Sequence, residues 1–286
     1  MTTESPTSAV TDISERFELL KPSLVRTETR VGPMAVYKND NIVSHSILLF
    51  GEYSHAEVLM MAHFLDKDSV YLDIGTNVGY HALGIHSVVG CRVIGFEPHP
   101  NHFAVAAFNC NEHNIQIYNC AVAEQDGLIT ISDFDETEVK NYGEVQTDTN
   151  GIEVKAVKLD TLNLPKVDLM KIDVEGFEIN VLEGATDTID KCRPVIFYEA
   201  LTLEDWGPCH DYLKAKKYKQ YWFTCRVKPI AETYKQTEEN PFGTSGVSNI
   251  LAIPEEDDQV EFLIPVIEGE HYNVSLDRIL NYKLIF

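Results

Sequence analysis

Residues 73–80 read DIGTNVGY and follow directly on the apolar run Val70-Tyr71-Leu72. An apolar strand that ends in a glycine-rich turn and opens a helix lets the backbone approach a ligand closely, with helix amides pointing into the crevice beyond the strand end. A second piece, FEP at residues 96–98, ends the next apolar run about twenty residues later, where the carboxylate of Glu97 can bind the two hydroxyls of a ribose. Together the two pieces predict a nucleoside-binding site.

The same order of apolar run and helix-length segment continues along the chain. Runs of strand length lie at residues 70–72, 93–96, 115–118, 169–172 and 195–198. Strands that alternate with helices predict a mostly parallel sheet with helices on both faces. Two later runs, 220–225 and 249–253, are joined by a polar loop, which predicts an antiparallel pair at one edge. We therefore expect an α/β fold with a seven-stranded, mostly parallel sheet and one antiparallel edge strand.

Composition shifts divide the chain into parts. We expect a tail without fixed structure at residues 1–16, a lead-in segment at 17–66, the main domain at 67–254 and a C-terminal extension at 255–286.

Two long polar segments, 133–151 and 233–247, interrupt the alternation of strands and helices. Short alternating runs at 128–132 and 152–158 flank the first segment and predict a hairpin. Both polar segments are candidate substrate loops, and solvated insertions explain them equally well.

The charge balance excludes several classes of partner. The 286 residues include 45 acidic and 23 basic side chains, a formal net charge of -22, and 44% hydrophobic residues, which is a globular composition. So negative a surface repels nucleic acid and anionic membranes, and no apolar run approaches the roughly 18 residues that span a bilayer. The six cysteines form no C-x-x-C pair, and the N-terminus lacks a basic and apolar leader. We therefore expect free thiols and a cytoplasmic location.

The glycine turn fits two ligands. A dinucleotide fingerprint would read G-x-G-x-x-G, but Asn77 replaces the middle glycine, and Asp73 puts a carboxylate where it would repel a diphosphate. S-adenosylmethionine carries a sulfonium and an ammonium group, so coulombic complementarity favours it over NAD. A purely structural turn is the third interpretation.

Residues 168–178, DLMKIDVEGFE, form a second group of candidate functional residues. Asp173 and Glu175 are spaced to point to the same side at the carboxyl end of a strand, beside the same crevice. Crowded carboxylates raise one another's proton affinity, so one of them could act as a general base. They could equally bind a divalent cation, or Glu175 and Glu178 could cap the following helix.

Histidines give weaker signals. His99 and His102 are spaced i, i+3 at a helix start, but no third ligand is in view, so a surface or capping role is favoured and we assign no metal site. His81 follows the glycine turn and could face the donor's carboxylate or a substrate, although packing is the commoner role.

Five sequence motifs, taken in their order along the chain, resemble those of the FkbM family of S-adenosylmethionine-dependent methyltransferases. They are residues 73–80 and 96–98, then NCAV at 119–122, LDTL at 159–162 and KIDVEGFE at 171–178, so the resemblance covers roughly residues 70–211. It implies a Rossmann-like class I methyltransferase fold and, as activity, O-methylation of sugar or natural-product hydroxyls.

The resemblance also implies site residues. Those expected at the methyl donor are Asp73, Gly75, Thr76, Asn77 and Gly79 around the methionine half, Glu97 and Pro98 at the ribose, Ala121 beside the adenine, and Tyr53 and Glu57 closing over the donor from the lead-in segment. Asp173 and Glu175 lie where the family's D-x-E-G motif borders the methyl group, and they are the expected catalytic residues.

The sequence thus predicts an S-adenosylmethionine-dependent O-methyltransferase that acts on a hydroxyl of a saccharide or related small molecule. The acidic charge favours an acceptor that is locally neutral or basic. Two alternatives are a catalytically silent module that uses this fold to bind a protein partner, and an NAD-dependent oxidoreductase. Neither the acceptor nor the oligomeric state can be predicted from these motifs.

Overall fold

The computed structural model describes residues 13–257, except 201–202, 229–232 and 244, together with residues 264–265. The first described element is helix α1 (Ile13–Leu20), whose Phe17 and Leu20 are buried. The helix begins inside the segment 1–16 that was expected to lack fixed structure, so ordered chain starts at least four residues earlier than the sequence analysis placed it.

One central sheet organises the described part of the chain. Its strand order is β13-β11-β12-β10-β9-β3-β4-β5. The bounds are β3 (Val70–Ile74), β4 (Arg92–Phe96), β5 (Ile115–Tyr118), β9 (Leu169–Ile172), β10 (Val195–Glu199), β11 (Tyr218–Arg226), β12 (Gly246–Pro254) and β13 (Ile264–Pro265). Strands β5, β4, β3, β9 and β10 are parallel, and β12 runs antiparallel between β10 and β11. The predicted mostly parallel sheet and the antiparallel pair β11–β12 are confirmed, and the two-residue β13 extends that edge.

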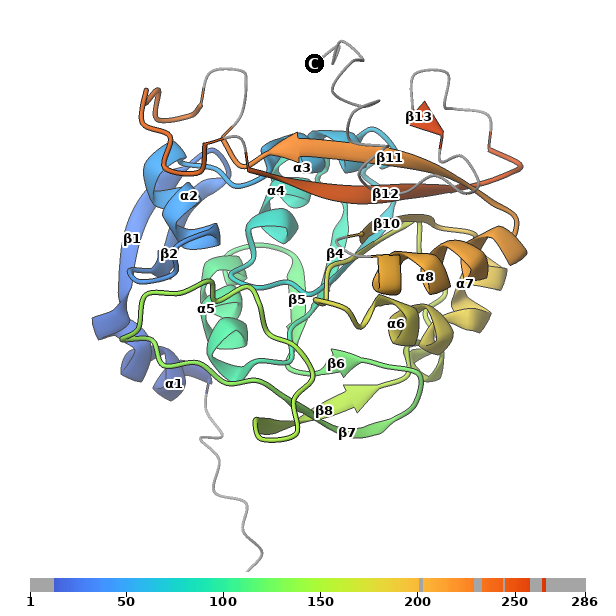
Figure 1. Cartoon of the computed structure of the whole chain (residues 1–286), viewed down its shortest axis with the longest axis horizontal. Helices are drawn as coiled ribbons and strands as arrows, with labels where there is room; N and C mark the ends of the chain where they lie inside the picture. The colour runs from blue at the N-terminus through green and yellow to red at the C-terminus, as the bar shows by residue number, and fades with distance from the viewer. Residues whose placement is uncertain (1–12, 201–202, 229–232, 244, 258–263, 266–286) are drawn as a thin grey trace, which may run out of the picture.

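Helices cover both faces of this sheet (Figure 1). The helices on one side are α2 (Val43–Phe50), α3 (His55–Ala62), α4 (Tyr80–Val89) and α5 (Pro100–Cys110), with α1 outside them, and those on the other are α6 (Glu178–Gly184), α7 (Thr186–Cys192) and α8 (Leu203–Ala215).

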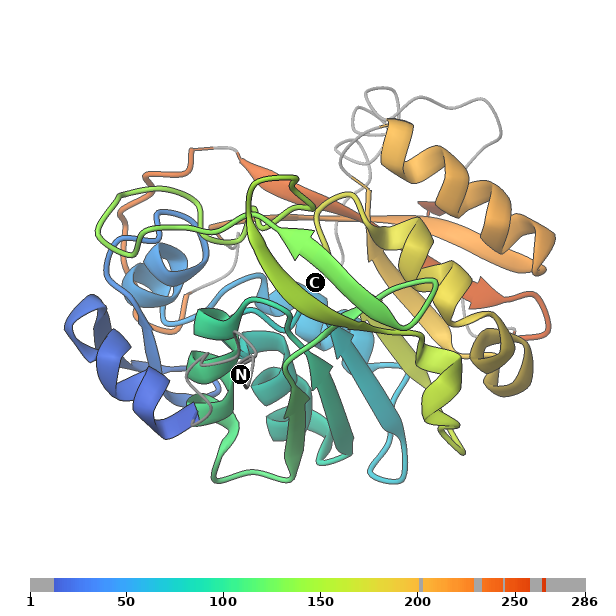
Figure 2. The same cartoon turned by 90° about the horizontal axis from the view of Figure 1, so that it is seen from below.

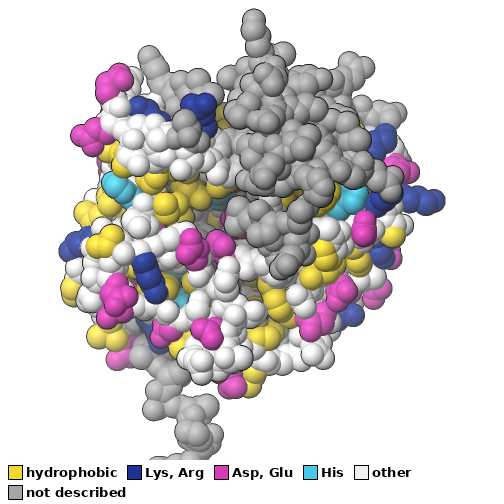
Figure 3. Space-filling model, in the orientation of Figure 1, with side chains coloured by type: hydrophobic (Ala, Val, Ile, Leu, Met, Phe, Trp, Pro, Cys, Tyr) yellow, Lys and Arg dark blue, Asp and Glu magenta, His cyan; other side chains and the backbone are white. Residues whose placement is uncertain are grey.

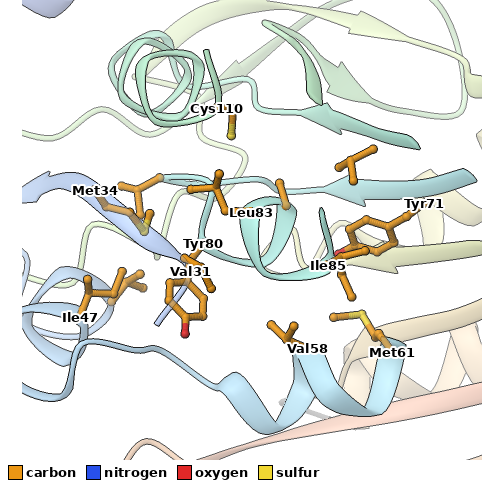
Figure 4. Close-up of a cluster of buried hydrophobic side chains, with 14 of the residues drawn as sticks. Val31, Met34, Ile47, Val58, Met61, Tyr71, Tyr80, Leu83, Ile85 and Cys110 are labelled. Atoms are coloured by element: carbon orange, nitrogen blue, oxygen red, sulfur yellow. The ribbon is translucent and has the colours of Figure 1, made fainter. Parts of the chain in front are cut away.

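Alternation along each strand divides the core between the two faces. Tyr71 faces the first set of helices and Leu72 the second, as the period of two in a strand requires. Figure 4 shows Tyr71 beside Ile85 of α4 and Met61 of α3.

The lead-in segment packs against the helices that border the strand ends. It contains the hairpin β1 (Leu24–Thr29) and β2 (Gly32–Tyr37), a 3-10 turn at Lys21–Ser23, and helices α2 and α3. Asn109 of α5 donates to the carbonyls of Ala35 and Val78 and accepts from the amide of Ala35, so it ties the hairpin to the loop after β3. The lead-in segment is therefore built into the same core as the sheet.

A small second sheet holds the predicted hairpin. Strands β7 (Gly127–Ile131) and β8 (Ile152–Val157) pair antiparallel, which confirms the prediction, and β6 (Ala121–Val122) adds in parallel to β8. Figure 2 shows this sheet as a separate layer crossing in front of the central one. A 3-10 turn at Leu159–Leu162 leads from it back to β9.

Surface features agree with the composition. On the face in Figure 3, basic and acidic side chains are interspersed and do not form separate patches. All six cysteines are free thiols, as expected. Among the described residues, no helix combines the length and the apolar character that crossing a bilayer requires.

Candidate active site

A cavity lies at the carboxyl ends of β3, β4, β9 and β10. Every predicted site residue lines it except Asp73 and Gly79. The structure thus brings together residues from the lead-in segment, the glycine turn and the D-x-E-G motif.

The glycine turn is tied to the end of the neighbouring strand. The amides of Gly75 and Thr76 both donate to the carbonyl of Phe96, at 3.0 and 3.1 Å, and Thr76 Oγ1 donates to the carbonyl of Asp73. Gly75 has φ +85° and Asn77 has φ +51°, so the turn uses left-handed backbone, which asparagine tolerates better than most residues. Gly79, the N-cap of α4, lies against Cys110 and Ala106 of α5 and away from the cavity.

Glu97 is held rigidly at the cavity wall. Its Oε2 accepts from the amide of Asn77 at 2.8 Å, and its Oε1 accepts from the amide of His99 at 2.9 Å. The side chain is buried, and burial raises its pKa to about 8 in spite of these two amides. Each carboxylate oxygen has a further lone pair, so the group can still accept from two ligand hydroxyls.

Asp73 lies behind the wall, in contact with a lysine that the sequence analysis did not single out. Parallel pairing of β3 with β9 sets Asp73 opposite Lys171. The Lys171 Nζ is 3.6 Å from Asp73 Oδ1 and 2.9 Å from Asp173 Oδ2. Burial alone would lower the pKa of Lys171, but Asp173 and Asp73 together raise it.

The carboxylate of Asp73 is buried behind the residues that line the cavity. Its Oδ1 is 3.6 Å from Lys171 Nζ, whereas its Oδ2 has no hydrogen-bond partner among the described residues, so the expected contact of Asp73 with the donor stays a prediction. The sequence signal for its partner was a lone lysine inside the apolar strand LMKI, because a buried charge needs a counter-charge. The carboxyl groups that line the cavity are those of Glu57, Glu97, Asp173, Glu175 and Glu199.

Three carboxyl groups meet at the ends of β9 and β10. One oxygen each from Asp173, Glu175 and Glu199 lies within 4.8 Å of the others, and oxygen ligands of this kind suit a divalent cation. Burial, and then the charge of Asp173, raise the pKa of Glu175 to about 8. Glu178 turns back instead and accepts from the amides of Val174 and Gly176. Glu178 therefore stabilises the turn before α6, while Glu175 faces the cavity.

Glu57 is an anchor within the wall. It is 4% exposed; its Oε1 accepts from Asn249 Nδ2 at 3.0 Å and from Cys225 Sγ at 3.4 Å, and its Oε2 lies 3.0 Å from His81 Nε2. The resemblance to the FkbM family implied that Glu57 closes over the donor. Both of its carboxylate oxygens already contact protein side chains, so in this structure Glu57 holds Asn249, Cys225 and His81 in position.

The opposite end of the cavity is mostly apolar. It is lined by Pro98, Cys120, Ala121, Val122, Ile129, Ile131 and Val145, with His102 among them. The segment 133–151 contributes Asn141, Gly143, Val145 and Thr147 to the wall, whereas Val247 is what 233–247 contributes among the described residues. Asp40 fastens the first segment, because it accepts from the amides of Tyr142 and of Ser44 in α2.

His99, Trp206 and Trp222 have capping and packing roles. His99 caps α5 by accepting from the amide of Asn101, which agrees with the capping role favoured for it, although its side chain is buried and not at the surface. Trp206 and Trp222 stack in the core with ring centroids 5.9 Å apart.

The raised carboxyl pKa values predict how stability depends on pH. Glu97 and Glu175 keep their protons up to about pH 8 in the folded protein but lose them near 4.3 when unfolded, so between these values the folded state binds more protons. The free energy of unfolding should therefore fall as pH rises from 5 to 8, by at most about 1.4 kcal/mol per pH unit for each group. Urea titrations of the ligand-free protein would measure this slope. Glu97→Gln should flatten it, and a stability that rises over this range would contradict the prediction.

Comparison with known proteins places these features in a family. The family model of the methyltransferase FkbM domain matches residues 73–219. Hexuronic acid methyltransferase AglP of Haloferax volcanii is 28% identical over 139 residues, which are 46% of this chain and 56% of that protein. Methyltransferase 1 of Beauveria bassiana is 26% identical over 169 residues, which are 48% of this chain and 68% of that protein.

A solved structure of a methyltransferase FkbM from Methylobacillus flagellatus aligns with a TM-score of 0.47 at 15% identity, over 70% of this chain and 48% of that one. The chain thus spans about half the length of AglP and of this structure. Because the family model matches more than half of the chain and includes the glycine turn, Glu97 and the D-x-E-G motif, the chain belongs to the FkbM methyltransferase domain family.

Proposed function

We propose that the protein is an S-adenosylmethionine-dependent O-methyltransferase that acts on a hydroxyl of a saccharide or related small molecule. The observation that carries the proposal is Glu97, which two backbone amides aim into a cavity beside the left-handed turn at Gly75. A carboxylate fixed at the end of the second strand is suited to the two hydroxyls of a ribose.

The residues present fit the methyl donor at both ends of the cavity. Glu97 would hold the ribose, Pro98 and Ala121 would flank the adenine with apolar surface, and the turn from Gly75 to Asn77 would border the methionine half. The carboxyl groups of Asp173, Glu175 and Glu199 form one wall, and a positively charged ligand beside them would favour their ionised forms. A pyrophosphate in the same place would face these carboxylates, which disfavours NAD.

The donor supplies a methyl group on a positively charged sulfur, so the protein must orient an acceptor oxygen in line and remove its proton. Lys171 holds Asp173 in place, with its Nζ 2.9 Å from Asp173 Oδ2. The relative AglP is named for a hexuronic acid, which supports a saccharide acceptor. In this chain Lys171 is already paired with two aspartates, so we propose an acceptor that is neutral or basic near its reacting hydroxyl.

Calorimetric titration with S-adenosylmethionine, S-adenosylhomocysteine and NADH tests the proposal. Both sulfur compounds should bind, and NADH should not. Glu97→Gln should weaken their binding about 100-fold, because an NH₂ group would replace one of the two acceptor oxygens, and each polar group left without its partner costs roughly 1–3 kcal/mol. Glu112→Gln, on an exposed residue beyond α5, is the matched control and should bind as the wild type does. Binding of NADH alone would overturn the proposal, and so would a Glu97→Gln variant of unchanged affinity.

A further inference from the structure

We propose that His81, held by Glu57, is the general base that takes the proton from the acceptor hydroxyl. This inference rests on the proposed methyl transfer and deepens it, because it assigns the proton acceptor. The sequence analysis had placed this role on the carboxylates of the D-x-E-G motif.

His81 has the position that a base requires. It is the second residue of α4, it is 7% exposed, and it lines the cavity beside the turn proposed to hold the methionine half. Its Nε2 is buried 3.0 Å from Glu57 Oε2, and among the described residues this nitrogen has no hydrogen-bond partner of good geometry. The rings of Tyr53 and Tyr80 meet its ring edge-on, each at 6.1 Å between centroids. The imidazole is therefore fixed in orientation.

Glu57 in turn is fixed by the antiparallel strands β11 and β12 of the central sheet. Asn249 of β12 and Cys225 of β11 both donate to its Oε1, which leaves Oε2 for His81. A carboxylate 3.0 Å from Nε2 favours, by its charge, the tautomer whose proton is on Nε2 and whose lone pair is on Nδ1, and it stabilises the imidazolium that forms when Nδ1 takes a proton. A base oriented by a third group in this way is a recurring arrangement in catalysis.

Asp173 is less suited to accept the proton. Its Oδ2 is in an ion pair with Lys171 at 2.9 Å, so protonation would cost that contact. His81 faces a different set of charges: Glu57 from α3, Asp73 from β3, and the rings of His55, Tyr53 and Tyr80. The carboxylates in this set favour the imidazolium produced by the reaction.

The acceptor O–H bond breaks and its proton moves to the free ring nitrogen of His81, while the oxygen forms the new bond to the methyl carbon. The carbon–sulfur bond breaks, its electron pair stays on sulfur, and the positive charge moves from the sulfonium to the imidazolium beside Glu57. The proton leaves to solvent after the products.

A competing role for His81 is to bind the donor's methionine carboxylate, and binding measurements separate the two. S-adenosylhomocysteine carries that carboxylate and 5′-methylthioadenosine lacks it. If His81 is the base, His81→Gln should bind both compounds within about threefold of the wild type. His86→Gln, on the same helix outside the cavity wall, is the control. A loss of tenfold or more for S-adenosylhomocysteine, with 5′-methylthioadenosine unchanged, would overturn the inference.

Nitrogen NMR of the histidine rings reads the proton state directly and needs no acceptor. With S-adenosylhomocysteine bound near pH 7.5, His81 should be neutral and protonated on Nε2, and Glu57→Gln should reduce the share of this tautomer. A doubly protonated ring in this complex, or a neutral ring protonated on Nδ1, would refute the base role. Thermal unfolding of each variant confirms that it is folded.

Turnover with labelled S-adenosylmethionine completes the test, using methyl β-D-glucopyranoside and methyl β-D-glucuronide as acceptor probes. With a probe that is methylated, His81→Gln should lower kcat about 100-fold or more and leave donor affinity unchanged, since general bases contribute roughly 10²–10⁴. Unchanged kcat would overturn the inference. If neither probe is methylated, the binding and NMR results decide whether His81 is the base. A wild-type protein that binds neither adenosine compound would instead remove the proposed function, and the base role with it.

Discussion

Gly75→Ala is expected to abolish detectable binding of S-adenosylmethionine and to lower the free energy of unfolding by about 4 kcal/mol. A Cβ built at this position would lie 1.8 Å from the backbone oxygen of Asp173 and 2.9 Å from its carbonyl carbon. Backbone atoms cannot rotate away, so the ends of β3 and β9 would have to separate. The turn that carries Asn77 and the wall that carries Asp173 would then both move. Calorimetry and urea unfolding measure the two losses.

Gly90→Ala is the matched control for this experiment. Gly90 also has a left-handed backbone, with φ +75°, but nothing lies within 4 Å of the place its Cβ would take. This variant should show only the cost of the backbone conformation, roughly 1–2 kcal/mol, and wild-type donor binding. If the two alanine variants were equally stable and both bound the donor normally, close approach at Gly75 would not shape the site.

The strands and the residues at their carboxyl ends could be predicted, because short stretches of sequence determine them. The runs at 70–72 and 93–96 are apolar and end in turn residues, and the turn that follows the first one needs its left-handed glycine wherever the rest of the chain goes. Parallel strands bring their carboxyl ends to one edge, so Gly75, Glu97 and Asp173 had to meet.

The contacts that assign roles to these residues are long-range and could not be predicted. Glu57 is bonded to Asn249, 192 residues away, and no period in the sequence links them. The bond between Asp40 and Tyr142, which fastens the segment 133–151, spans 102 residues. The two-residue strand β6 is too short for any pattern to reveal it. For the same reason, His81 looked like a packing residue until its neighbour Glu57 was known.

Lys171→Met is expected to lower the free energy of unfolding by about 3–5 kcal/mol at pH 8. Lys171 is 2% exposed and is the shared counter-ion of Asp73 and Asp173. Methionine fills a similar space but leaves both aspartates without their cation, and Asp73 is fully buried. Urea unfolding at pH 5.5 and pH 8 measures the loss. Lys166→Met is the control, because its ion pair with Asp168 is half exposed and such pairs contribute roughly 0–1 kcal/mol.

The pH dependence of the Lys171→Met variant distinguishes charge from packing. Burial already raises the pKa of Asp73 against the lowering effect of Lys171, so without the ammonium group the pKa of this carboxyl in the folded state rises further above the unfolded value near 3.9. Between those values the folded variant binds more protons than the unfolded chain, and its stability falls as pH rises. The deficit relative to the wild type should therefore be smaller at pH 5.5 than at pH 8. Adding Asp73→Asn removes one unpaired charge and should recover a large part of the loss at pH 8. A deficit that is equal at both pH values and unchanged by Asp73→Asn would show that Lys171 contributes by packing and does not act as the counter-ion of this site.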